Sequence, residues 1–424
     1  MSTRAGIIVT GTEVLTGRVA DRNGPWLAEQ LRVSGVDVSE VIVVGDRASD
    51  LRDCLTFLAG SGVDVIITSG GLGPTADDLT AQIVAEFQGR PPELDLDLEA
   101  RIATIIERLS AGRGWRLDPQ ATAAAVRKQA LVPLGANVLA PVGTAPGLVV
   151  PVADGRTGPP VIVLPGPPAE LQPMWPAALA DPVVSAALGA REELFQRTIR
   201  LWGTPESELA ALLRTHDQRL ADLEITTCLR GGELEIVTRF GPAARSTYDE
   251  FDDLVADTFA DTVFSRDGRT VDQVVADALR VQNRTIATAE SCTAGLLAGR
   301  LTDLAGSSDY VRGGLIVYSD AAKHELAGVP TELIATVGAV SAEVAAALAA
   351  GARDRLVADI GVGITGVAGP GGGTALKPVG LVHLCVTGPD RTVARTVNLP
   401  GGRTDVRART VTVAMHLLRG LLLR

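Results

Sequence analysis

Apolar and polar positions follow two different rhythms along the first 170 residues. Short runs rich in Val and Ile are separated by longer segments whose Leu and Ala residues recur at helical spacing. The strand-like runs are residues 5–10, 38–44 and 63–71, and the helical segments between them are residues 25–35 and 51–62. A β-α-β-α-β order of this kind predicts a mainly parallel sheet with helices on both faces.

Residues 175–262 follow a different pattern. Two strand-like runs within residues 225–240 are joined across Arg230-Gly231-Gly232, and residues 251–263 have helical spacing. These features predict a small α+β module. A Gly-Gly turn also occurs in the RNA-binding KH fold, but a KH loop needs basic flanks, which this region lacks. We therefore interpret the module as a structural spacer or a dimerisation element.

A second alternation of strand-like and helical segments begins near residue 268 and continues to the end of the chain. The polar segment 265–270 is expected to be a linker. The pattern therefore predicts two α/β domains joined by a small α+β domain, with boundaries at residues 1–172, 173–264 and 265–424.

Composition and charge exclude several classes of protein. The 39 basic and 50 acidic side chains give a net charge of −11, which disfavours sequence-independent binding of nucleic acid. The four cysteines form no CxxC and the histidines no HExxH, so neither a zinc site nor a disulfide framework is expected. No apolar stretch reaches the roughly 18 residues of a membrane helix, and no signal segment begins the chain. We expect a cytoplasmic protein that does not contact a membrane.

Three adjacent candidate nucleophiles, Ser291, Cys292 and Thr293, follow the strand-like run 285–289. The next segment, residues 292–301, has leucines at helical spacing, which places Ser291 at a helix N-terminus. Unpaired amides and the helix dipole would stabilise a developing negative charge there. A serine at such a position can equally be a simple N-cap.

The segment SGGLGPTADDLT, residues 69–80, is the clearest signal in the first half. Its glycines would let the backbone approach a phosphate closely, and a helix capped by Thr75 would add amide donors. Asp77 and Asp78 in the first turn could bind a divalent cation that bridges to the ligand, or could merely complement the helix dipole. The segment has neither the Walker A lysine nor a complete GxGxxG fingerprint.

Ordered motifs along nearly the whole chain resemble the CinA (competence/damage-inducible) family. In the first half they are VTGTEVLTGRVADRNGPWLAEQL, SGGLGPTADDLT, RKQALVP, PVGTAPG and LPGPPAEL, which are similar to a molybdopterin-binding domain of the MoaB/MogA type. In the second half AESCTAG, AGSS, YSDAAK, GAVS and TGVAGPGGGTALKPVG resemble the PncC-type amidase domain. Residues 173–264 would correspond to the family's KH-like middle domain.

This resemblance implies a bifunctional enzyme of pyridine-nucleotide salvage. The C-terminal domain would deamidate nicotinamide mononucleotide to nicotinate mononucleotide and ammonia, without a cofactor. The N-terminal domain would hydrolyse ADP-ribose to AMP and ribose 5-phosphate with Mg²⁺, Mn²⁺ or Co²⁺. The partners would be these small nucleotides and a second copy of the chain in a homodimer.

The family's catalytic residues match Ser291 as nucleophile, Lys323 as base, and Tyr318 as the residue that orients the lysine or relays its proton. Amides at the start of the 292–301 helix could hold the oxyanion. Cys292 has no recognisable histidine partner and is expected to be a buried filler. The positions implied to bind substrate are Thr293, Gly295, Thr365, Gly366, Gly369, Gly372 and Lys377 in the amidase domain, and Gly70, Gly71, Gly73 and Thr75 in the first domain. The implied metal ligands are Asp77 and Asp78.

Several positions leave alternatives open. Glu13, Asn23 and Asp46 are further candidates for the first site beside Asp77 and Asp78, and the sequence does not decide which of the five bind the metal. The segments AESCTAG and YSDAAK carry Ala294 and Asp320 where the family usually has Gly and Asn, and Asp320 adds a charge that could shift the lysine. The first domain could also bind a pterin-type ligand without turnover, or the chain could be a non-enzymatic interaction protein of DNA uptake.

Overall fold

The computed structural model describes residues 3–113, 118–189 and 194–423. The chain forms two compact units, Met1–Phe195 and Gln196–Arg424. In the described parts of the chain, no helix has both the length and the apolar character needed to cross a membrane.

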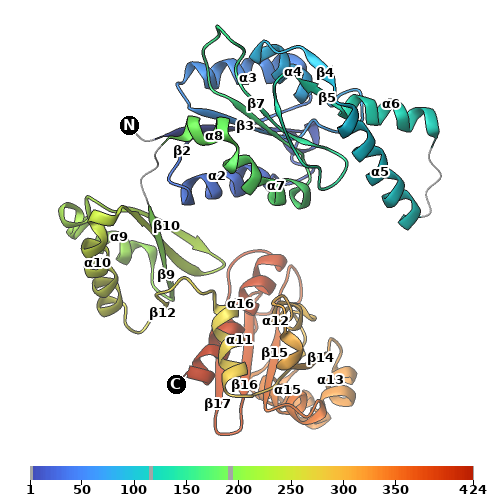
Figure 1. Cartoon of the computed structure of the whole chain (residues 1–424). Helices are drawn as coiled ribbons and strands as arrows, with labels where there is room; N and C mark the ends of the chain where they lie inside the picture. The colour runs from blue at the N-terminus through green and yellow to red at the C-terminus, as the bar shows by residue number, and fades with distance from the viewer. Residues whose placement is uncertain (1–2, 114–117, 190–193, 424) are drawn as a thin grey trace. The chain divides into compact units, whose positions relative to one another are not determined.

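The first unit contains a six-stranded sheet in the order β2-β1-β3-β8-β7-β6 (Figure 1). The strands β2, β1, β3 and β8 run parallel to one another. Strand β7 pairs antiparallel with β8, and β6 pairs antiparallel with β7. This confirms the predicted mainly parallel sheet. The strands are β1 (Arg4–Thr10), β2 (Asp37–Val44), β3 (Val65–Ser69), β6 (Asn137–Leu139), β7 (Gly147–Val150) and β8 (Val161–Leu164).

Helices cover both faces of this sheet, as the alternation predicts. One core contains leucines of α3 and side chains of α4 and α5, and the other contains side chains of α2, α7 and α8 (Figure 1). A separate hairpin pairs β4 (Pro92–Leu94) with β5 (Leu131–Pro133). The helices are α1 (Thr12–Leu15), α2 (Asn23–Val33), α3 (Ala48–Gly60), α4 (Thr80–Gln88), α5 (Leu96–Arg113), α6 (Pro119–Gln129), α7 (Pro168–Ala180) and α8 (Pro182–Leu188).

The first unit extends beyond the boundary expected at residue 172. Met174 and Trp175 on α7 and Leu188 on α8 are buried in the same core as β1 and β3. Burial of these large side chains ties both helices to the first sheet, so the compact unit ends at Phe195.

The second unit begins with a four-stranded sheet in the order β10-β11-β9-β12. The predicted hairpin across Arg230-Gly231-Gly232 is confirmed, because β10 and β11 pair antiparallel with Arg230 opposite Glu233. The KH-like character of this module remains a prediction. Its elements are β9 (Phe195–Trp202), α9 (Glu206–Thr215), the short 3₁₀ helix Asp217–Leu220, β10 (Glu224–Arg230), β11 (Glu233–Phe240), the 3₁₀ helix Pro242–Ala244, α10 (Arg245–Thr258) and β12 (Val263–Ser265).

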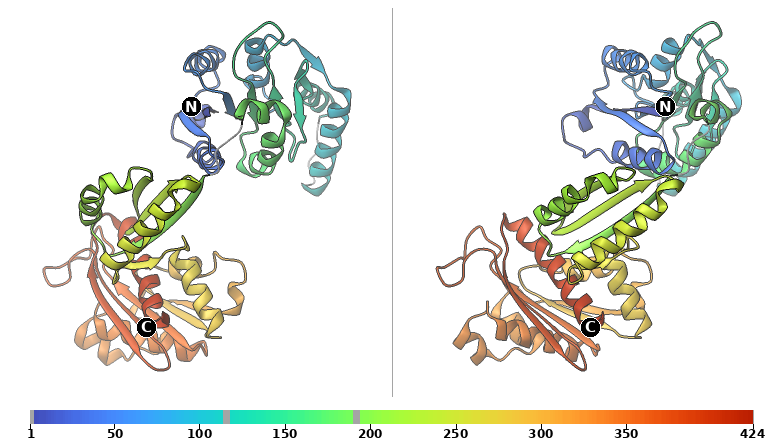
Figure 2. Two further views of the ribbon diagram at one scale, coloured as in Figure 1. Left: turned by 60° about the vertical axis from the view of Figure 1, so that its left-hand side comes forward. Right: turned by 90° about the vertical axis from the view of Figure 1, so that its left-hand side faces the viewer.

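The remainder of the second unit is a five-stranded sheet in the order β14-β13-β15-β16-β17, in which β14, β13 and β15 are parallel. Helices α11, α12 and α16 pack on one face and α13, α14 and α15 on the other (Figure 2). The strands are β13 (Ile286–Glu290), β14 (Val311–Ile316), β15 (Ile360–Gly366), β16 (Leu381–Thr387) and β17 (Thr392–Asn398). The helices are α11 (Val271–Val281), α12 (Leu296–Leu301), α13 (Asp320–Ala327), α14 (Thr331–Val337), α15 (Ala342–Arg355) and α16 (Arg403–Leu423), and the 3₁₀ turn Ser307–Asp309 precedes β14.

Within this unit the four-stranded sheet contacts α16 through a buried histidine. His416 on α16 is buried, its Nε2 lies 2.8 Å from Oε1 of Glu233, and its ring stacks on Trp202 at 4.3 Å. Burial lowers the pKa of His416, opposed by Glu233. His416 therefore connects α16, which packs on the five-stranded sheet, to the four-stranded sheet, although the sequence pattern assigns them to separate domains.

Candidate functional site

A cavity of about 350 Å³ lies at the carboxyl ends of β1, β3 and β8 in the first unit. Ligands of open α/β sheets commonly bind at such an edge. The structure brings together there all six residues that the sequence assigns to this site, and adds Glu13 and Asp46. The lining residues are Thr10, Gly11, Glu13, Asp46, Gly70, Gly71, Leu72, Gly73, Thr75, Asp77, Asp78, Thr144, Ala145, Pro165, Gly166, Pro167 and Glu170.

Glycine is required at two positions of this loop. Gly70 and Gly71 have φ angles of 106° and 68°, a region that other residues rarely adopt. A Cβ at Gly70 would lie 2.5 Å from the carbonyl oxygen of Thr10, and one at Gly71 would overlap the hydroxyl of Thr80. The bare backbone therefore forms this wall of the cavity.

Thr75 does not cap a helix, and the expectation that Asp77 and Asp78 occupy a first helical turn is wrong. The Thr75 hydroxyl lies 2.5 Å from a carboxylate oxygen of each aspartate, and the Thr75 amide donates to Asp78 Oδ2 at 2.9 Å. These side-chain bonds compete with helical backbone bonds, so α4 begins only at Thr80. The bond from Thr75 also lowers the pKa of Asp77.

The donor set of the cavity fits a cation only together with a ligand. No group of three acidic, histidine or cysteine side chains close enough to hold a metal occurs among residues 3–113, 118–189 and 194–423. Asp77 and Asp78 are adjacent and share Thr75. Mg²⁺ is commonly held by one or two carboxylates with the remaining positions filled by water and substrate phosphates, so this pair is compatible with a phosphate-dependent site.

Sequence reasoning missed several polar residues that line the cavity, and it named one candidate, Asn23, that does not line it. Thr144 and Glu170 line the cavity, and burial raises the pKa of Glu170. Thr144 lies in the motif PVGTAPG and Glu170 in LPGPPAEL, so these two motifs could have indicated them. Asn23 does not line the cavity, because its amide donates to Ser69 Oγ at 2.8 Å and to the Gly166 carbonyl at 2.5 Å.

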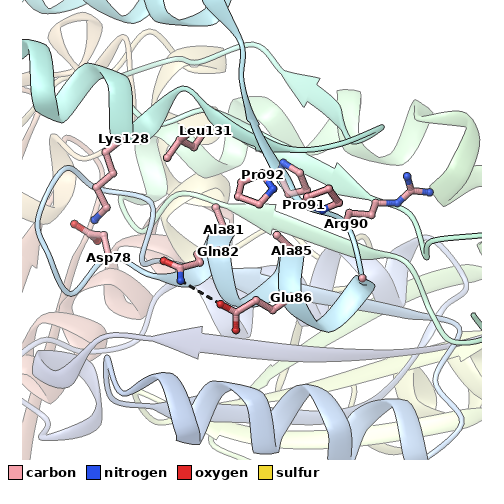
Figure 3. Close-up of a pocket in the computed structure, with 12 residues that line it drawn as sticks. Asp78, Ala81, Gln82, Ala85, Glu86, Arg90, Pro91, Pro92, Lys128 and Leu131 are labelled. Atoms are coloured by element: carbon pink, nitrogen blue, oxygen red, sulfur yellow. Dashed lines mark hydrogen bonds between the residues drawn. The ribbon is translucent and has the colours of Figure 1, made fainter.

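A second cavity, of about 320 Å³, lies beside the first and shares Asp78 with it (Figure 3). It is bounded by α4 on one side and by the hairpin β4–β5 on the other. The lining residues are Asp78, Ala81, Gln82, Ala85, Glu86, Gly89, Arg90, Pro91, Pro92, Lys128, Leu131 and Pro133.

In the second unit, Ser291, Tyr318 and Thr365 lie at the carboxyl ends of adjacent strands. Ser291 directly follows β13, Tyr318 is the second residue after β14, and Thr365 is the last residue but one of β15. The Ser291 amide donates to the carbonyl of Ile364 at 3.0 Å, which ties the serine to β15. The topology of the parallel strands thus collects residues that are far apart in the sequence.

The helix expected over residues 292–301 begins only at Leu296, so Ser291 is not at a helix N-terminus. The cause is Glu290, a residue the sequence reasoning did not single out. Its carboxylate has no exposed surface, and it accepts hydrogen bonds from the amides of Gly295, Leu297 and Ala298 at 3.0, 3.1 and 2.8 Å. These three amides are therefore not available to an oxyanion, and for the amides of residues 292–294 the expectation stays a prediction.

The loop between Glu290 and α12 is held from two sides. Ala294 and Gly295 adopt left-handed conformations with φ angles of 50° and 92°. Arg407 of α16 donates to the carbonyl oxygens of Cys292 and Thr293 at 3.1 and 3.0 Å. A carboxylate on the amides and a guanidinium on the carbonyls thus fix the segment that carries the nucleophile candidates.

Lys323 on α13 is buried and lies beside one carboxylate. Its side chain is 3% exposed, and burial lowers its pKa, opposed mainly by Asp320 at 3.7 Å. Its Nζ donates to the carbonyl oxygen of Tyr318 at 3.2 Å. The Tyr318 hydroxyl instead accepts from Arg403 at 3.0 Å, so the contact with the lysine comes from the main chain.

Cys292 and Thr293 are both buried. Burial, reinforced by the charge of Glu290, raises the pKa of the Cys292 thiol to about 11. A thiol with so high a pKa supplies little thiolate at neutral pH. The Thr293 hydroxyl is buried without a hydrogen-bond partner in the described structure.

The loop after β15 is structurally anchored at several of its predicted binding positions. The Thr365 hydroxyl donates to the Ala339 carbonyl at 2.8 Å, and Lys377 Nζ donates to the Val337 carbonyl at 2.7 Å. Arg403 donates to the carbonyl of Gly369 at 2.8 Å. Lys377 therefore binds the carbonyl of Val337, the last residue of α14. Arg403 contacts both this loop, at Gly369, and the Tyr318 hydroxyl. Gly366 ends β15, and Gly372 has a φ angle of 82° in the same loop.

Family models match both the first and the second half of the chain. Residues 268–422 match the model of the CinA C-terminal domain, and residues 6–185 match that of a probable molybdopterin binding domain. A CinA-like protein of Mycobacterium sp. (strain MCS) is 57% identical over 99% of this chain and 99% of its own length. This chain belongs to the CinA-like family.

Other relatives of the family extend the comparison. The CinA-like protein of Mycobacterium tuberculosis (strain ATCC 25177 / H37Ra) is 53% identical over 99% of this chain and 97% of its own length. A crystal structure of a competence/damage inducible protein from Agrobacterium tumefaciens is 40% identical, covers 36% of this chain and 94% of its own, and has a TM-score of 0.35.

Proposed function

We propose that the second unit of this CinA-like chain deamidates nicotinamide mononucleotide to nicotinate mononucleotide and ammonia. The observation that carries this proposal is a buried lysine of lowered pKa, Lys323, on the helix that follows the strand next to Ser291. A neutral lysine in a dry site can act as the general base for a serine hydroxyl. The choice of nicotinamide mononucleotide as substrate rests on the resemblance of the second-half motifs to the PncC-type amidase domain.

In the proposed reaction Lys323 takes the proton from Ser291 as the serine Oγ attacks the carboxamide carbon. The C–N bond then breaks, and the leaving nitrogen receives the lysine proton and departs as ammonia. Water, deprotonated by the same amine, cleaves the resulting ester and releases nicotinate mononucleotide. The Tyr318 carbonyl, 3.2 Å from Nζ, orients the amine, and no cofactor takes part.

The loop after β15 would hold the nucleotide part of the substrate. Its members are Thr365, Gly366, Gly369, Gly372 and Lys377, with Thr293 and Gly295 from the nucleophile loop. Thr293 supports this role, because a buried hydroxyl without a partner costs free energy that a ligand acceptor would recover.

The first unit, we infer, hydrolyses ADP-ribose to AMP and ribose 5-phosphate. Its glycine loop offers a close backbone approach, with Gly70, Gly71, Gly73 and Thr75 lining the cavity. Its carboxylates would repel a pyrophosphate, so the reaction requires a divalent cation, Mg²⁺, Mn²⁺ or Co²⁺, held by Asp77 and Asp78. Such a cation supplies charge neutralisation at the phosphates.

One experiment tests both activities. The purified full-length protein is incubated separately with nicotinamide mononucleotide and with ADP-ribose plus each cation, and the products are identified. Ammonia from the first and AMP from the second support the proposal. Tight binding of a pterin without release of AMP would instead favour a ligand carrier in the first unit. The protein is further proposed to be a cytoplasmic homodimer, and sedimentation tests the dimer. Neither nucleic acid nor a membrane is a proposed partner, and binding assays with each test this.

A further inference from the structure

We propose that the outer edge of β10 pairs with the same edge of a second copy of the chain, so that the four-stranded sheets of two copies continue into each other. β10 is the outermost strand in the order β10-β11-β9-β12, and no strand within residues 3–113, 118–189 and 194–423 pairs with its outer edge. The inference rests on the proposed homodimer, to which it assigns an interface, and is independent of both proposed reactions.

The edge of β10 carries none of the features that usually prevent strands from pairing. Edge strands are commonly protected by proline, by lysine or by a β-bulge. The sequence of β10 is EITTCLR, and its register with β11 runs without a shift from Glu224 to Arg230. Its β-branched residues favour an extended strand, and the Leu229 side chain is 58% exposed. The strand is therefore suited to accept another strand.

The turn between β10 and β11 determines which backbone groups face the open edge. Gly231 and Gly232 have φ angles of 61° and 92°, as in a two-residue type I′ hairpin. Arg230 and Glu233, which flank this turn and lie opposite each other, therefore form a hydrogen-bonded pair. Because such pairs alternate along an antiparallel ladder, the amides and carbonyls that point outward belong to Ile225, Thr227 and Leu229.

A second copy of β10 fits this edge in an antiparallel register that has a two-fold axis at Thr227. Thr227 then lies opposite itself, and Ile225 lies opposite Leu229 of the partner subunit. These are the residues whose backbone groups point outward, so their amides and carbonyls can bond in pairs. The same register places Glu224 opposite Arg230 of the partner subunit at both ends of the strand. Opposite charges directly across two strands stabilise their pairing.

Both end residues are accessible for these ion pairs. The Glu224 side chain is 55% exposed, although its Oε2 lies 3.4 Å from Nε of Arg239, and Arg230 is exposed. The edge strand β17 of the five-stranded sheet provides a contrast, because the same operation on Thr392–Asn398 would place Arg395 opposite itself. Charge complementarity therefore favours β10 as the paired edge and a second copy as its occupant.

The test uses the full-length protein and exchanges the charges at the ends of β10. Glu224→Arg leaves only arginines at the two ends, and Arg230→Glu leaves only glutamates. Each variant should repel its own copy, so its self-association measured by sedimentation equilibrium should weaken at least tenfold. An equimolar mixture of the two variants should associate again, because the arginines of one chain then face the glutamates of the other.

Two further variants test the apolar pair and the register. Leu229→Lys places a charge on the edge and should also weaken self-association. Val281→Lys changes another exposed apolar residue of the same unit, on α11, and is the matched control that should have no effect. Thr227→Cys in a Cys228→Ser background should form a disulfide-linked dimer on mild oxidation, because opposed residues of such a pair lie about 5.5 Å apart between Cα atoms.

Restored association in the mixture, together with the disulfide-linked dimer, would support the paired edge. A monomeric wild-type protein would overturn both this edge and the proposed homodimer. A dimer that Glu224→Arg, Arg230→Glu and Leu229→Lys leave intact would overturn the edge alone and leave the homodimer to another surface. Folded charge variants that stay apart when mixed would also overturn it. If circular dichroism shows that a charge variant is unfolded, absence of the disulfide-linked dimer would overturn the edge and its presence would support it.

Discussion

Glu290 should control the rate of deamidation although it is not the nucleophile or the base. Its two carboxylate oxygens share four donors: Oε2 accepts from the amides of Gly295 and Leu297, and Oε1 from the Ala298 amide and the Thr288 hydroxyl. Glu290→Gln keeps the shape of the side chain but replaces one acceptor with an NH₂ group. The substitution therefore perturbs hydrogen bonding with little change in packing.

The orientation of the new amide sets the size of the effect. With its oxygen toward Gly295 and Leu297, the NH₂ faces the Ala298 amide, while the Thr288 hydroxyl can turn and accept. One buried amide then loses its partner, which costs about 1–3 kcal/mol. The opposite orientation leaves two amides without partners and costs about twice as much. The protein should adopt the cheaper arrangement and remain folded, since domains typically have stabilities of about 5–15 kcal/mol.

The loop that relaxes around the unpaired amide carries Ser291 at its start. A displacement of about 1 Å of a reacting group can cost on the order of 10²-fold in rate. We therefore expect kcat for nicotinamide mononucleotide to fall by about that factor, with a much smaller change in KM, because the predicted nucleotide contacts lie mainly on the loop after β15. Thermal unfolding and steady-state ammonia release measure the two effects.

The matched control is Glu233→Gln, which alters another buried carboxylate of the same unit, bound to His416. It should lower stability and leave kcat near the wild-type value. A Glu290→Gln protein with wild-type melting temperature and wild-type kcat would refute the reasoning. So would a loss of kcat in both variants that merely follows their loss of stability.

Two further substitutions test the separate sites. Asp78→Ala should abolish cleavage of ADP-ribose, because it removes one of the two carboxylates proposed to hold the cation, and should leave deamidation intact. Equal loss of AMP release and ammonia release would contradict this. Asp320→Asn removes the carboxylate 3.7 Å from Lys323, whose charge opposes the lowering of the lysine pKa. The lysine pKa should then fall further, so the rising limb of the kcat–pH profile should move to lower pH. Because Asp320 is exposed, the shift should be less than about one pH unit, and a shift to higher pH would show that Lys323 is not the base.

The central strands of the two larger sheets could be predicted from the sequence, because β1, β3 and β13 are buried almost throughout and form short apolar runs in the sequence. The strand β3 falls within its predicted segment, and β1 and β13 each extend one residue beyond theirs. The candidate residues of the first cavity were also predictable, since glycines with left-handed conformations mark the loop.

The errors arose where one side chain overrides a local pattern. Glu290 accepts hydrogen bonds from the amides of Gly295, Leu297 and Ala298, two of which a helix from residue 292 would use for its own backbone bonds, and the Thr75–Asp78 bonds replace the first helical turn. The second cavity could not be foreseen, because its walls come from α4 and from two short strands 37 residues apart in the sequence, Leu94 pairing with Leu131. Such contacts depend on tertiary structure rather than on periodicity.

The identity of the nucleophile is the central claim, and one comparison tests it most directly. Ammonia release from saturating nicotinamide mononucleotide is measured for Ser291→Ala and for Cys292→Ser. Since burial raises the Cys292 pKa to about 11, Cys292→Ser should retain nearly all of the wild-type rate, whereas Ser291→Ala should release no ammonia yet still bind the substrate. An active Ser291→Ala protein together with an inactive Cys292→Ser protein would contradict the account and identify the thiol as the attacking group.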